Sequence, residues 1–221
     1  MRMLKDKRLL ALAELVEKCD TVADIGADHG YLGCHLLECG KAGQVWFTDI
    51  SAKSLDKARE LARPLELSGR CAFFVCDGAE GLPDAPDFAV VAGMGGQTIC
   101  HILESGAQKL KGSALVLGAN TGLYELRAFL ALHGYRIDEE VVQTEAGRHY
   151  VLMRARPGKA EYSPEQLLAG PVLMKRQSAA DREYFAYRLL VARRALEKAQ
   201  KSSGDAAQKL QWEAEVWKSL C

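Results

Sequence analysis

The stretch that decides the fold is residues 24–33, which read Asp-Ile-Gly-Ala-Asp-His-Gly-Tyr-Leu-Gly. A short apolar run, residues 21–25, leads into it, and a helical pattern begins at Tyr31. The sequence therefore predicts a strand, a glycine-bearing turn and a helix. Glycines in such a turn let the backbone approach a bound ligand closely, as in α/β proteins that hold nucleotide-like molecules.

Asp28 stands where a dinucleotide-binding turn has its middle glycine. A carboxylate there repels a pyrophosphate, which sits at the N-terminus of the first helix in NAD-binding proteins. The same carboxylate tolerates or favours a ligand that carries an ammonium and a sulfonium. The turn thus favours S-adenosylmethionine over NAD, although glycine-rich turns also occur in α/β proteins that bind no such ligand.

The composition is that of a globular protein with one domain and a small appendage. The chain has 221 residues, of which 48% are hydrophobic and 26% charged. The apolar run at residues 9–16 is short and interrupted by Glu14, and no stretch approaches the roughly 20 apolar residues of a membrane span. The seven cysteines show no CxxC pair and no metal-ligand spacing. We expect reduced thiols in a cytoplasmic protein with no metal and no membrane contact.

The charge is unevenly distributed along the chain. The net charge is zero, but residues 171–221 contain ten Lys and Arg against six Asp and Glu. A basic appendage on an acidic domain indicates a polyanionic partner, although charged helix faces are equally often just solvated.

Apolar periodicity predicts a helix over residues 4–19 and then alternating strands and helices. The strands are expected at 21–25, 44–49, 71–75, 88–93, 113–118, 135–143 and 149–155, and the helices at 31–39, 52–67, 96–106 and 123–133. Such alternation predicts a parallel sheet with helices on both faces. The link between the last two strands is too short for a helical crossover, so these strands should pair antiparallel. We therefore expect an α/β, Rossmann-like class I methyltransferase fold with a seven-stranded, mostly parallel sheet over residues 1–157.

Residues 158–221 are expected to form a separate helical domain. Apolar residues step by three and four through residues 185–199 and again through 207–221, with a break at residues 202–205. This pattern predicts a helical hairpin with a coiled-coil-like seam. Ser163 and Pro164 have the pattern of a helix start.

Polar side chains and glycines follow four of the predicted strands. Gly26, Asp28 and His29 follow the first strand, Asp49 ends the second, Asp77-Gly78 follows the third, and Gly93-Met94-Gly95-Gly96 follows the fourth. Ligands of doubly wound sheets bind at these carboxyl ends. Asp49 is placed to bind both hydroxyls of a ribose, and Asp77 to accept a hydrogen bond from an adenine amino group. Each acid alone also fits a helix cap or a turn.

Several motifs resemble the TrmK-type tRNA (adenine-N1)-methyltransferase family. They are residues 24–32, which are similar to the family's DIGSDHAYLP signature, Cys76-Asp77-Gly78, residues 92–96, residues 101–106 with Leu110, and the opening Lys7-Arg8-Leu9. Together with the two-helix tail they cover nearly the whole chain. The resemblance implies methylation of N1 of adenine 22 in tRNA by S-adenosylmethionine, in bacteria. Three positions depart from the family pattern: Gly118-Ala119 replaces Gln-Pro, Gly33 replaces Pro, and Asp49 replaces Glu.

The chemistry of this implied reaction suggests roles for individual residues. Asp28 is expected to stabilise the cationic product ring or accept a proton from the exocyclic amine, and Asn120 to hydrogen-bond the base. The residues expected to bind the cofactor are Asp24, Gly26, His29, Gly30, Asp49, Ile50, Asp77, Gly78, Gly93, Met94 and Gly95. Those expected to bind RNA phosphates are Lys175, Arg176, Arg182, Arg188, Arg193 and Arg194.

Alternatives remain open from the sequence. His29 equally fits a capping histidine. Tyr31 fits a ring that stacks on the base, but an aromatic residue at a helix start lies more often in the core. The altered Gly118-Ala119 keeps another RNA site or a small-molecule substrate in consideration. A non-catalytic RNA-binding protein that retains the cofactor fold is a further alternative, whereas Asp28 and the closing hairpin oppose an NAD-dependent oxidoreductase. We expect tRNA as partner and a monomer or weak dimer.

Overall fold

The computed structural model describes residues 5–65, 67–199 and 205–221. The chain divides into two compact units, Met1–Ala160 and Glu161–Cys221. The division falls shortly after residue 157, where the sequence places the domain boundary.

The first unit is built on one seven-stranded sheet in the order β3-β2-β1-β4-β5-β7-β6. Its strands are β1 (Cys19–Ile25), β2 (Ala42–Asp49), β3 (Cys71–Val75), β4 (Phe88–Met94), β5 (Ala114–Ala119), β6 (Tyr135–Glu145) and β7 (Arg148–Pro157). β1 to β5 pair parallel, whereas β7 is antiparallel to both β5 and β6. The predicted fold class is confirmed, including the antiparallel hairpin. The topological switch point lies between β1 and β4, because the chain builds outward to β3 and then returns beside β1.

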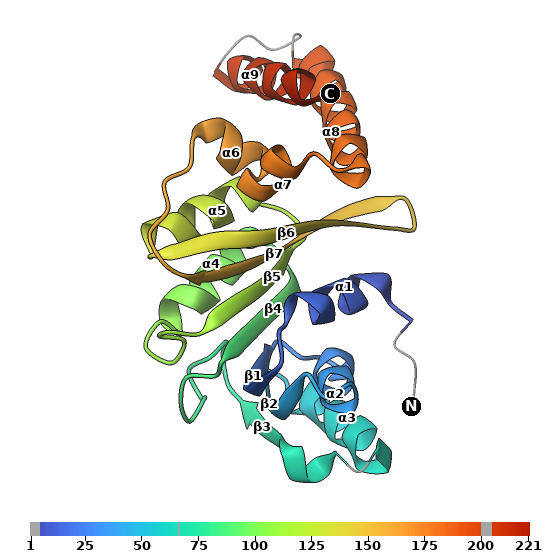
Figure 1. Cartoon of the computed structure of the whole chain (residues 1–221), viewed down its shortest axis with the longest axis vertical. Helices are drawn as coiled ribbons and strands as arrows, with labels where there is room; N and C mark the ends of the chain where they lie inside the picture. The colour runs from blue at the N-terminus through green and yellow to red at the C-terminus, as the bar shows by residue number, and fades with distance from the viewer. Residues whose placement is uncertain (1–4, 66, 200–204) are drawn as a thin grey trace. The chain divides into compact units, whose positions relative to one another are not determined.

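Helices cover both faces of this sheet. They are α1 (Lys7–Leu15), α2 (Tyr31–Glu38), α3 (Ala52–Ala62), α4 (Gly96–Ser105) and α5 (Leu123–Leu132), with 3₁₀ turns at Arg63–Leu65 and Ser68–Arg70. Figure 1 shows α1, α2 and α3 on one side of the sheet and α4 and α5 on the other.

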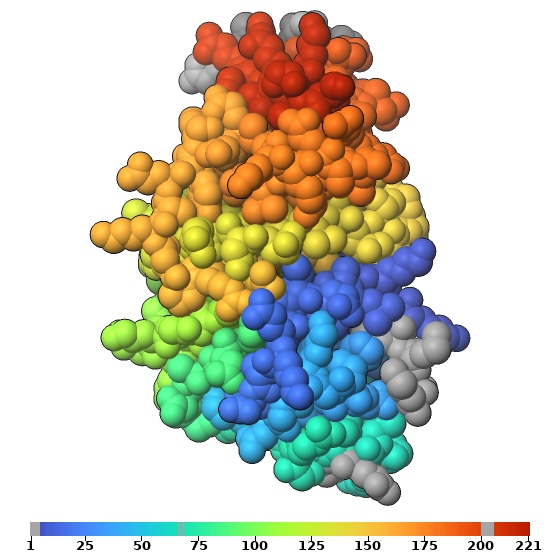
Figure 2. All heavy atoms as spheres, in the orientation of Figure 1, coloured from blue at the N-terminus to red at the C-terminus, as the bar shows by residue number. Residues whose placement is uncertain are grey.

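Helix α1 is shorter than the helix predicted over residues 4–19, of which residue 4 lies outside the described residues. Asp6 caps its start, since its side chain accepts a hydrogen bond from the Leu9 N–H at 3.0 Å. Val16 already has extended backbone angles, and β1 follows from Cys19. Val16 is fully buried. Its apolar side chain fits the spacing of the helix's buried face, which is why the sequence pattern predicted a longer helix. In the space-filling view α1 (dark blue) lies between the β6–β7 hairpin (yellow) and α2 (light blue) (Figure 2).

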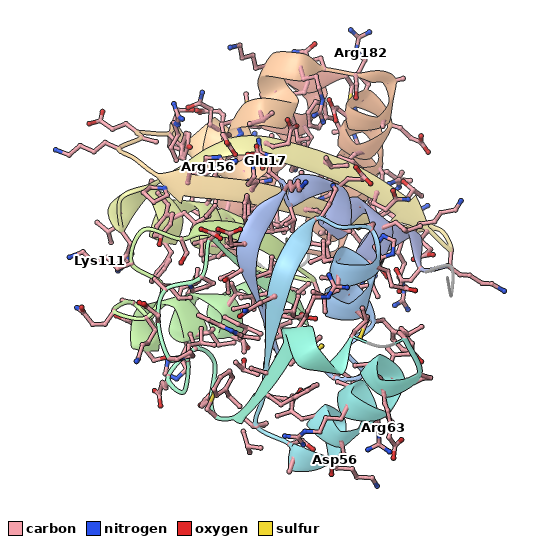
Figure 3. The ribbon with its side chains drawn as sticks, turned by 60° about the horizontal axis from the view of Figure 1, so that its bottom comes forward. Glu17, Asp56, Arg63, Lys111, Arg156 and Arg182 are labelled. Carbon is pink, nitrogen blue, oxygen red and sulfur yellow. The ribbon has the colours of Figure 1, made fainter. Side chains whose placement is uncertain are left out.

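An ion-pair network ties the end of α1 to the β6–β7 hairpin. The two oxygens of Asp138, which lies at a register shift in β6, each accept a hydrogen bond at 2.9 Å, one from Arg154 Nε and one from Arg156 Nε. Glu17 Oε1 lies 3.1 Å from Arg154 Nη1 and 2.6 Å from Arg156 Nη2. Figure 3 shows Glu17 and Arg156 next to each other. The network restrains the segment that follows α1, and so helps to fix the helix against the hairpin.

The second unit is helical, as predicted. Its helices are α6 (Pro164–Ala169), α7 (Pro171–Arg176), α8 (Ala179–Ala199) and α9 (Asp205–Leu220). Ser163 caps α6 in a capping box with Gln166. Helices α8 and α9 pack together around the buried rings of Tyr184, Phe185 and Trp217, with the Tyr184 and Trp217 rings edge to face at 5.9 Å. Residues 202–204 of the predicted break lie outside the described residues.

Candidate active site

The turn after β1 is bent by three residues with left-handed backbone angles. The φ angles are +70° at Gly26, +47° at Asp28 and +71° at Gly30. Glycine adopts this conformation freely, and Asp is among the few other residues that tolerate it. The N–H groups of Gly26 and Ala27 donate to the Thr48 carbonyl at 2.8 and 3.0 Å. These bonds fasten the turn to the end of β2 at the switch point.

Three carboxylates gather at this turn, and two of them lie on its surface. Asp49 Oδ2 accepts the Asp28 N–H at 3.2 Å, and Asp49 Oδ1 accepts the Ser51 N–H at 2.8 Å. Each Asp49 oxygen keeps a lone pair for a further donor, as a ribose diol requires. The Asp28 side chain accepts a hydrogen bond from His29 Nδ1 at 2.6 Å, and the His29 ring stacks on Tyr31 at 5.6 Å.

The third carboxylate, Asp24, is buried and has an altered pKa. Its side chain is 6% exposed, and its Oδ2 accepts the Gly33 N–H at 3.1 Å, which ties β1 to α2. Burial raises the pKa of Asp24 to about 7, the Gly33 hydrogen bond lowers it, and the nearby charge of Asp49 raises it. A positively charged ligand beside Asp24 would favour its ionised form.

The opposite side of the site is formed by the ends of β4 and β5. Asn120 Nδ2 donates to the Gly93 carbonyl, and the Asn120 N–H donates to the Met94 carbonyl, both at 2.8 Å. The Gly96 N–H donates to the Thr121 carbonyl at 2.8 Å. Asn120 is therefore fixed by two bonds, and its Oδ1 is left as an acceptor for a substrate.

A cleft of about 360 Å³ lies between the turn and the end of β4. It is lined by Arg8, Leu9, Asp24, Ile25, Gly26, Ala27, Asp28, His29, Tyr31, Leu32, Ala92, Gly93 and Met94. Six predicted site residues are thus brought together, and the sequence interpretation missed Arg8 and Leu9 of α1. A basic residue in an amphipathic helix carries no local signal of ligand binding, so only the family's opening motif pointed to this segment.

The other predicted site residues are not among those that line the cleft. Asp49 and Asn120 each form a hydrogen bond to a residue that does line the cleft, Asp49 to Asp28 and Asn120 to Gly93. Ile50 is 74% exposed, and Asp77 is exposed beside Gly78, whose carbonyl accepts the Thr48 hydroxyl at 2.8 Å. The remaining two are Gly30 and Gly95, which cap the starts of α2 and α4.

The six predicted RNA-binding residues of the helical unit differ in their contacts. Arg176 forms a bidentate ion pair with the buried Asp181, at 2.9 and 2.8 Å. The guanidinium of Arg188 lies over the Trp217 ring at 5.2 Å, and its Nε is buried. Arg188 is partly buried, whereas the other five, Lys175, Arg176, Arg182, Arg193 and Arg194, are exposed.

Residues 5–65, 67–199 and 205–221 contain no cluster of His, Cys, Asp and Glu side chains that could bind a metal ion. Within the same ranges no helix has the length and apolar character needed to cross a bilayer.

Comparisons with known proteins agree with this geometry. The sequence profile of the methyltransferase domain family matches residues 5–153. The tRNA (adenine(22)-N(1))-methyltransferase of Bacillus subtilis is 31% identical over 181 residues, 78% of this chain and 76% of that protein. The crystal structure of the B. subtilis m1A22 tRNA methyltransferase TrmK covers 97% of both chains with a TM-score of 0.87 and 26% identity. A Streptococcus pneumoniae protein solved with S-adenosyl-L-methionine has a TM-score of 0.88 and 25% identity, over 98% of this chain and 99% of that one. The chain therefore belongs to the TrmK-type tRNA (adenine-N1)-methyltransferase family of the class I methyltransferases.

Proposed function

We propose that this protein transfers the methyl group of S-adenosylmethionine to N1 of adenine 22 in tRNA. The observation that carries the proposal is a cleft lined by an acidic turn and by Gly93, whose carbonyl fixes the amide of Asn120, in a chain 31% identical to a curated m1A22 enzyme.

The residues present fit the methyl donor. A cleft of about 360 Å³ is within the usual range for small-molecule sites. The carboxylates of Asp24 and Asp28 suit a cationic ligand, and the open acceptor positions of Asp49 suit a ribose. Nothing but Arg8 lies within 4 Å of the position that a Cβ on Gly93 would take, which leaves open space beside that backbone among the described residues. When bound, S-adenosylmethionine supplies a methyl group on a sulfonium, an electrophile strong enough for a neutral nitrogen.

The protein's task in this reaction is to position the base and manage charge. Adenine N1 has a free lone pair near neutral pH, so no strong base is needed to create the nucleophile. Asn120 Oδ1 accepts a hydrogen bond from the exocyclic amino group and fixes the ring in its plane, which contributes several kcal/mol through orientation. The ring becomes cationic as N1 gains the methyl group. The Asp28 carboxylate, held by His29 Nδ1, stabilises that charge or accepts a proton from the amino group.

The tRNA is proposed to contact the helical unit. Base 22 must leave its stack before transfer, at a cost of a few kcal/mol. Phosphate contacts by the exposed Lys175, Arg182, Arg193 and Arg194 would offset that cost. We further propose a cytoplasmic location, in line with the seven free cysteines. The proposed oligomeric state is a monomer or weak dimer.

The altered Gly118-Ala119 does not by itself favour another substrate. Gly118 is buried, and a Cβ there would lie 3.2 Å from both the Ala92 Cβ and the Leu152 Cδ2. Neighbouring apolar side chains therefore occupy the space that a larger residue would need. The base contact then depends on Asn120, which the chain keeps.

Mass spectrometry of tRNA nucleosides tests the function directly. The purified protein is incubated with donor carrying a deuterated methyl group and with a bacterial tRNA transcript that has adenine at position 22. The expected product is labelled 1-methyladenosine, absent from a transcript with guanine at that position. Label in another nucleoside, or undiminished label in the guanine-22 transcript, would show a different substrate.

A further inference from the structure

Helix α8 carries exposed apolar side chains on the side that does not pack on α9. One of its buried side chains, Tyr184, meets the Trp217 ring of α9. Tyr187 and Leu190, in contrast, are 42% and 47% exposed, and Val191 beside them is 39% exposed. Single exposed apolar side chains are common, whereas neighbouring ones on one helix face mark a contact surface.

This apolar surface has an acidic residue at one end and a basic residue at the other. Glu183 lies four residues before Tyr187, and Arg194 lies four residues after Leu190. Because Tyr187 and Leu190 are three residues apart, all four side chains lie on one face of the helix. We call these four residues the α8 row. Glu183 and Arg194 are exposed, and among the described residues no ion pair joins either of them to another side chain.

The α8 row is complementary to a second copy of itself. Its steps of four, three and four residues are the same from either end, and such steps place side chains at the seam between paired helices. When two copies of α8 pack antiparallel about a two-fold axis, Glu183 of each copy lies opposite Arg194 of the other. Tyr187 of each copy then lies opposite Leu190 of the other. A parallel pair would instead bring each charge against its own kind, so the row favours the antiparallel arrangement.

The residues that continue the row at its ends fit the same register. Ala180 lies three residues before Glu183, and Glu197 lies three residues after Arg194. Glu197 of one copy therefore lies opposite the small, exposed Ala180 of the other, and no like charges face each other there. The 21 residues of α8 span only about 30 Å, so one such helix pair is small beside the ~1,200–2,000 Å² of a stable interface. The association is expected to be weak.

We propose that the α8 row is the contact surface of a weak, two-fold symmetric dimer in which two copies of α8 pack antiparallel. This inference does not depend on the reaction that the protein catalyses. Under the proposed function, Arg194 also contacts a tRNA phosphate. A second copy of the protein and tRNA then compete for the same face of α8.

Sedimentation velocity over protein concentrations from ~10 µM to ~1 mM measures the dissociation constant of the dimer. The wild type should shift from monomer toward dimer within this range. Leu190→Glu places a charge at the centre of the row and should raise the dissociation constant by at least ~10-fold. The matched control is Leu132→Glu, at a leucine of α5 that is 83% exposed, and it should leave the dissociation constant unchanged.

Two charge reversals test the antiparallel register. Glu183→Arg and Arg194→Glu each leave a row with a single sign of charge, and each should raise the dissociation constant about 3- to 10-fold. An equimolar mixture of these two variants has opposite charges at every facing pair, so it should associate about as tightly as the wild type. Both positions are exposed, and the melting temperatures of the variants should match that of the wild type.

A wild type that remains monomeric up to ~1 mM would overturn the proposal, and so would a Leu190→Glu variant that associates like the wild type. A mixture of the charge variants that associates no more tightly than its components would refute the antiparallel register, and with it the proposal. If the protein were monomeric throughout and Leu190→Glu weakened tRNA binding, the row would be an RNA contact instead of a dimer surface.

Discussion

Gly96→Ala is expected to disturb catalysis by displacing the loop that carries Asn120. A Cβ on Gly96 would lie 2.3 Å from the Gly122 carbonyl oxygen and 2.9 Å from that of Thr121. Both atoms belong to the backbone, so no side-chain rotation relieves the contact. The Thr121 carbonyl also accepts the Gly96 N–H at 2.8 Å, which holds the two segments together. The substitution must therefore move the loop itself.

The size of the movement follows from ordinary contact distances. A Cβ essentially never lies closer than 3.0 Å to another atom, and ordinary contact begins at 3.4 Å, so the Gly122 oxygen must withdraw from 2.3 Å by about 1 Å. Overpacking of this kind costs about 1–3 kcal/mol in the free energy of unfolding. A displacement of about 1 Å at a positioning group lowers a reaction rate by about 100-fold. We expect a comparable loss in methyl transfer, with a much smaller change in the binding of S-adenosylhomocysteine.

Three measurements separate these effects: urea denaturation, calorimetry with S-adenosylhomocysteine, and single-turnover methyl transfer to tRNA. Gly69→Ala is the matched control, because nothing lies within 4 Å of its Cβ position among the described residues. It should leave all three quantities close to the wild type. If Gly96→Ala kept the wild-type urea midpoint and transfer rate, the close contact between the start of α4 and the Asn120 loop would not control the position of Asn120, and the reasoning would be refuted.

Three further predictions concern charge. Asp28→Asn keeps a residue type that tolerates the left-handed φ of +47° and should lower single-turnover transfer at saturating S-adenosylmethionine by about 100-fold or more; an unchanged rate at saturation would exclude a catalytic role. Asp24 has a folded pKa of about 7, above its ordinary 3.8, so its ionisation should lower the stability of the ligand-free protein as pH rises from about 4 to 7. Asp24→Asn should remove that component, which urea midpoints at pH 5 and pH 8 will reveal; an identical pH dependence in both proteins would contradict it. Replacing Arg193 and Arg194 by Gln should weaken tRNA binding and reduce the salt slope of log K by about 0.7–0.9 per lost phosphate contact, and an equal slope would show that they touch no phosphate.

The sheet could be predicted from the sequence because its signals are local. Runs of apolar residues alternated with helical patterns, and the five residues between the last two predicted strands, 135–143 and 149–155, left no room for a crossover helix. The acids of the site were also predictable, because a strand end is a defined place in an α/β sheet. Asp28 and Asp49 meet through a hydrogen bond at the switch point, as their positions in the sequence suggested.

The contacts of arginine side chains were not predictable in the same way. Arg8 reaches the cleft because α1 packs against α2, β5, β6 and β7, which the sequence pattern of one helix does not encode. Arg188 was expected to bind RNA phosphates, yet its guanidinium lies over the Trp217 ring of another helix. Arg176 forms an ion pair with Asp181, five residues later, across the link between α7 and α8. A count of charged residues does not show which of them form such pairs. Charge counts predict that the helical unit is basic, but they do not predict which of its cationic side chains contact other residues of the protein.

The distribution of charge also explains how an acidic cleft can serve an anionic polymer. Screening at physiological salt acts over about 8 Å, so carboxylates at the β1 turn repel a phosphate only when it comes close to them. A base that has left its stack extends away from its own phosphates, and its adenine ring is neutral before it reacts. The ring can therefore approach Asp28 and Asn120 while the backbone stays outside the range of the acids. Under the proposed function, an acidic turn next to the reaction would thus admit the extruded base, stabilise the cation that forms on it, and leave phosphate binding to exposed cations elsewhere on the protein.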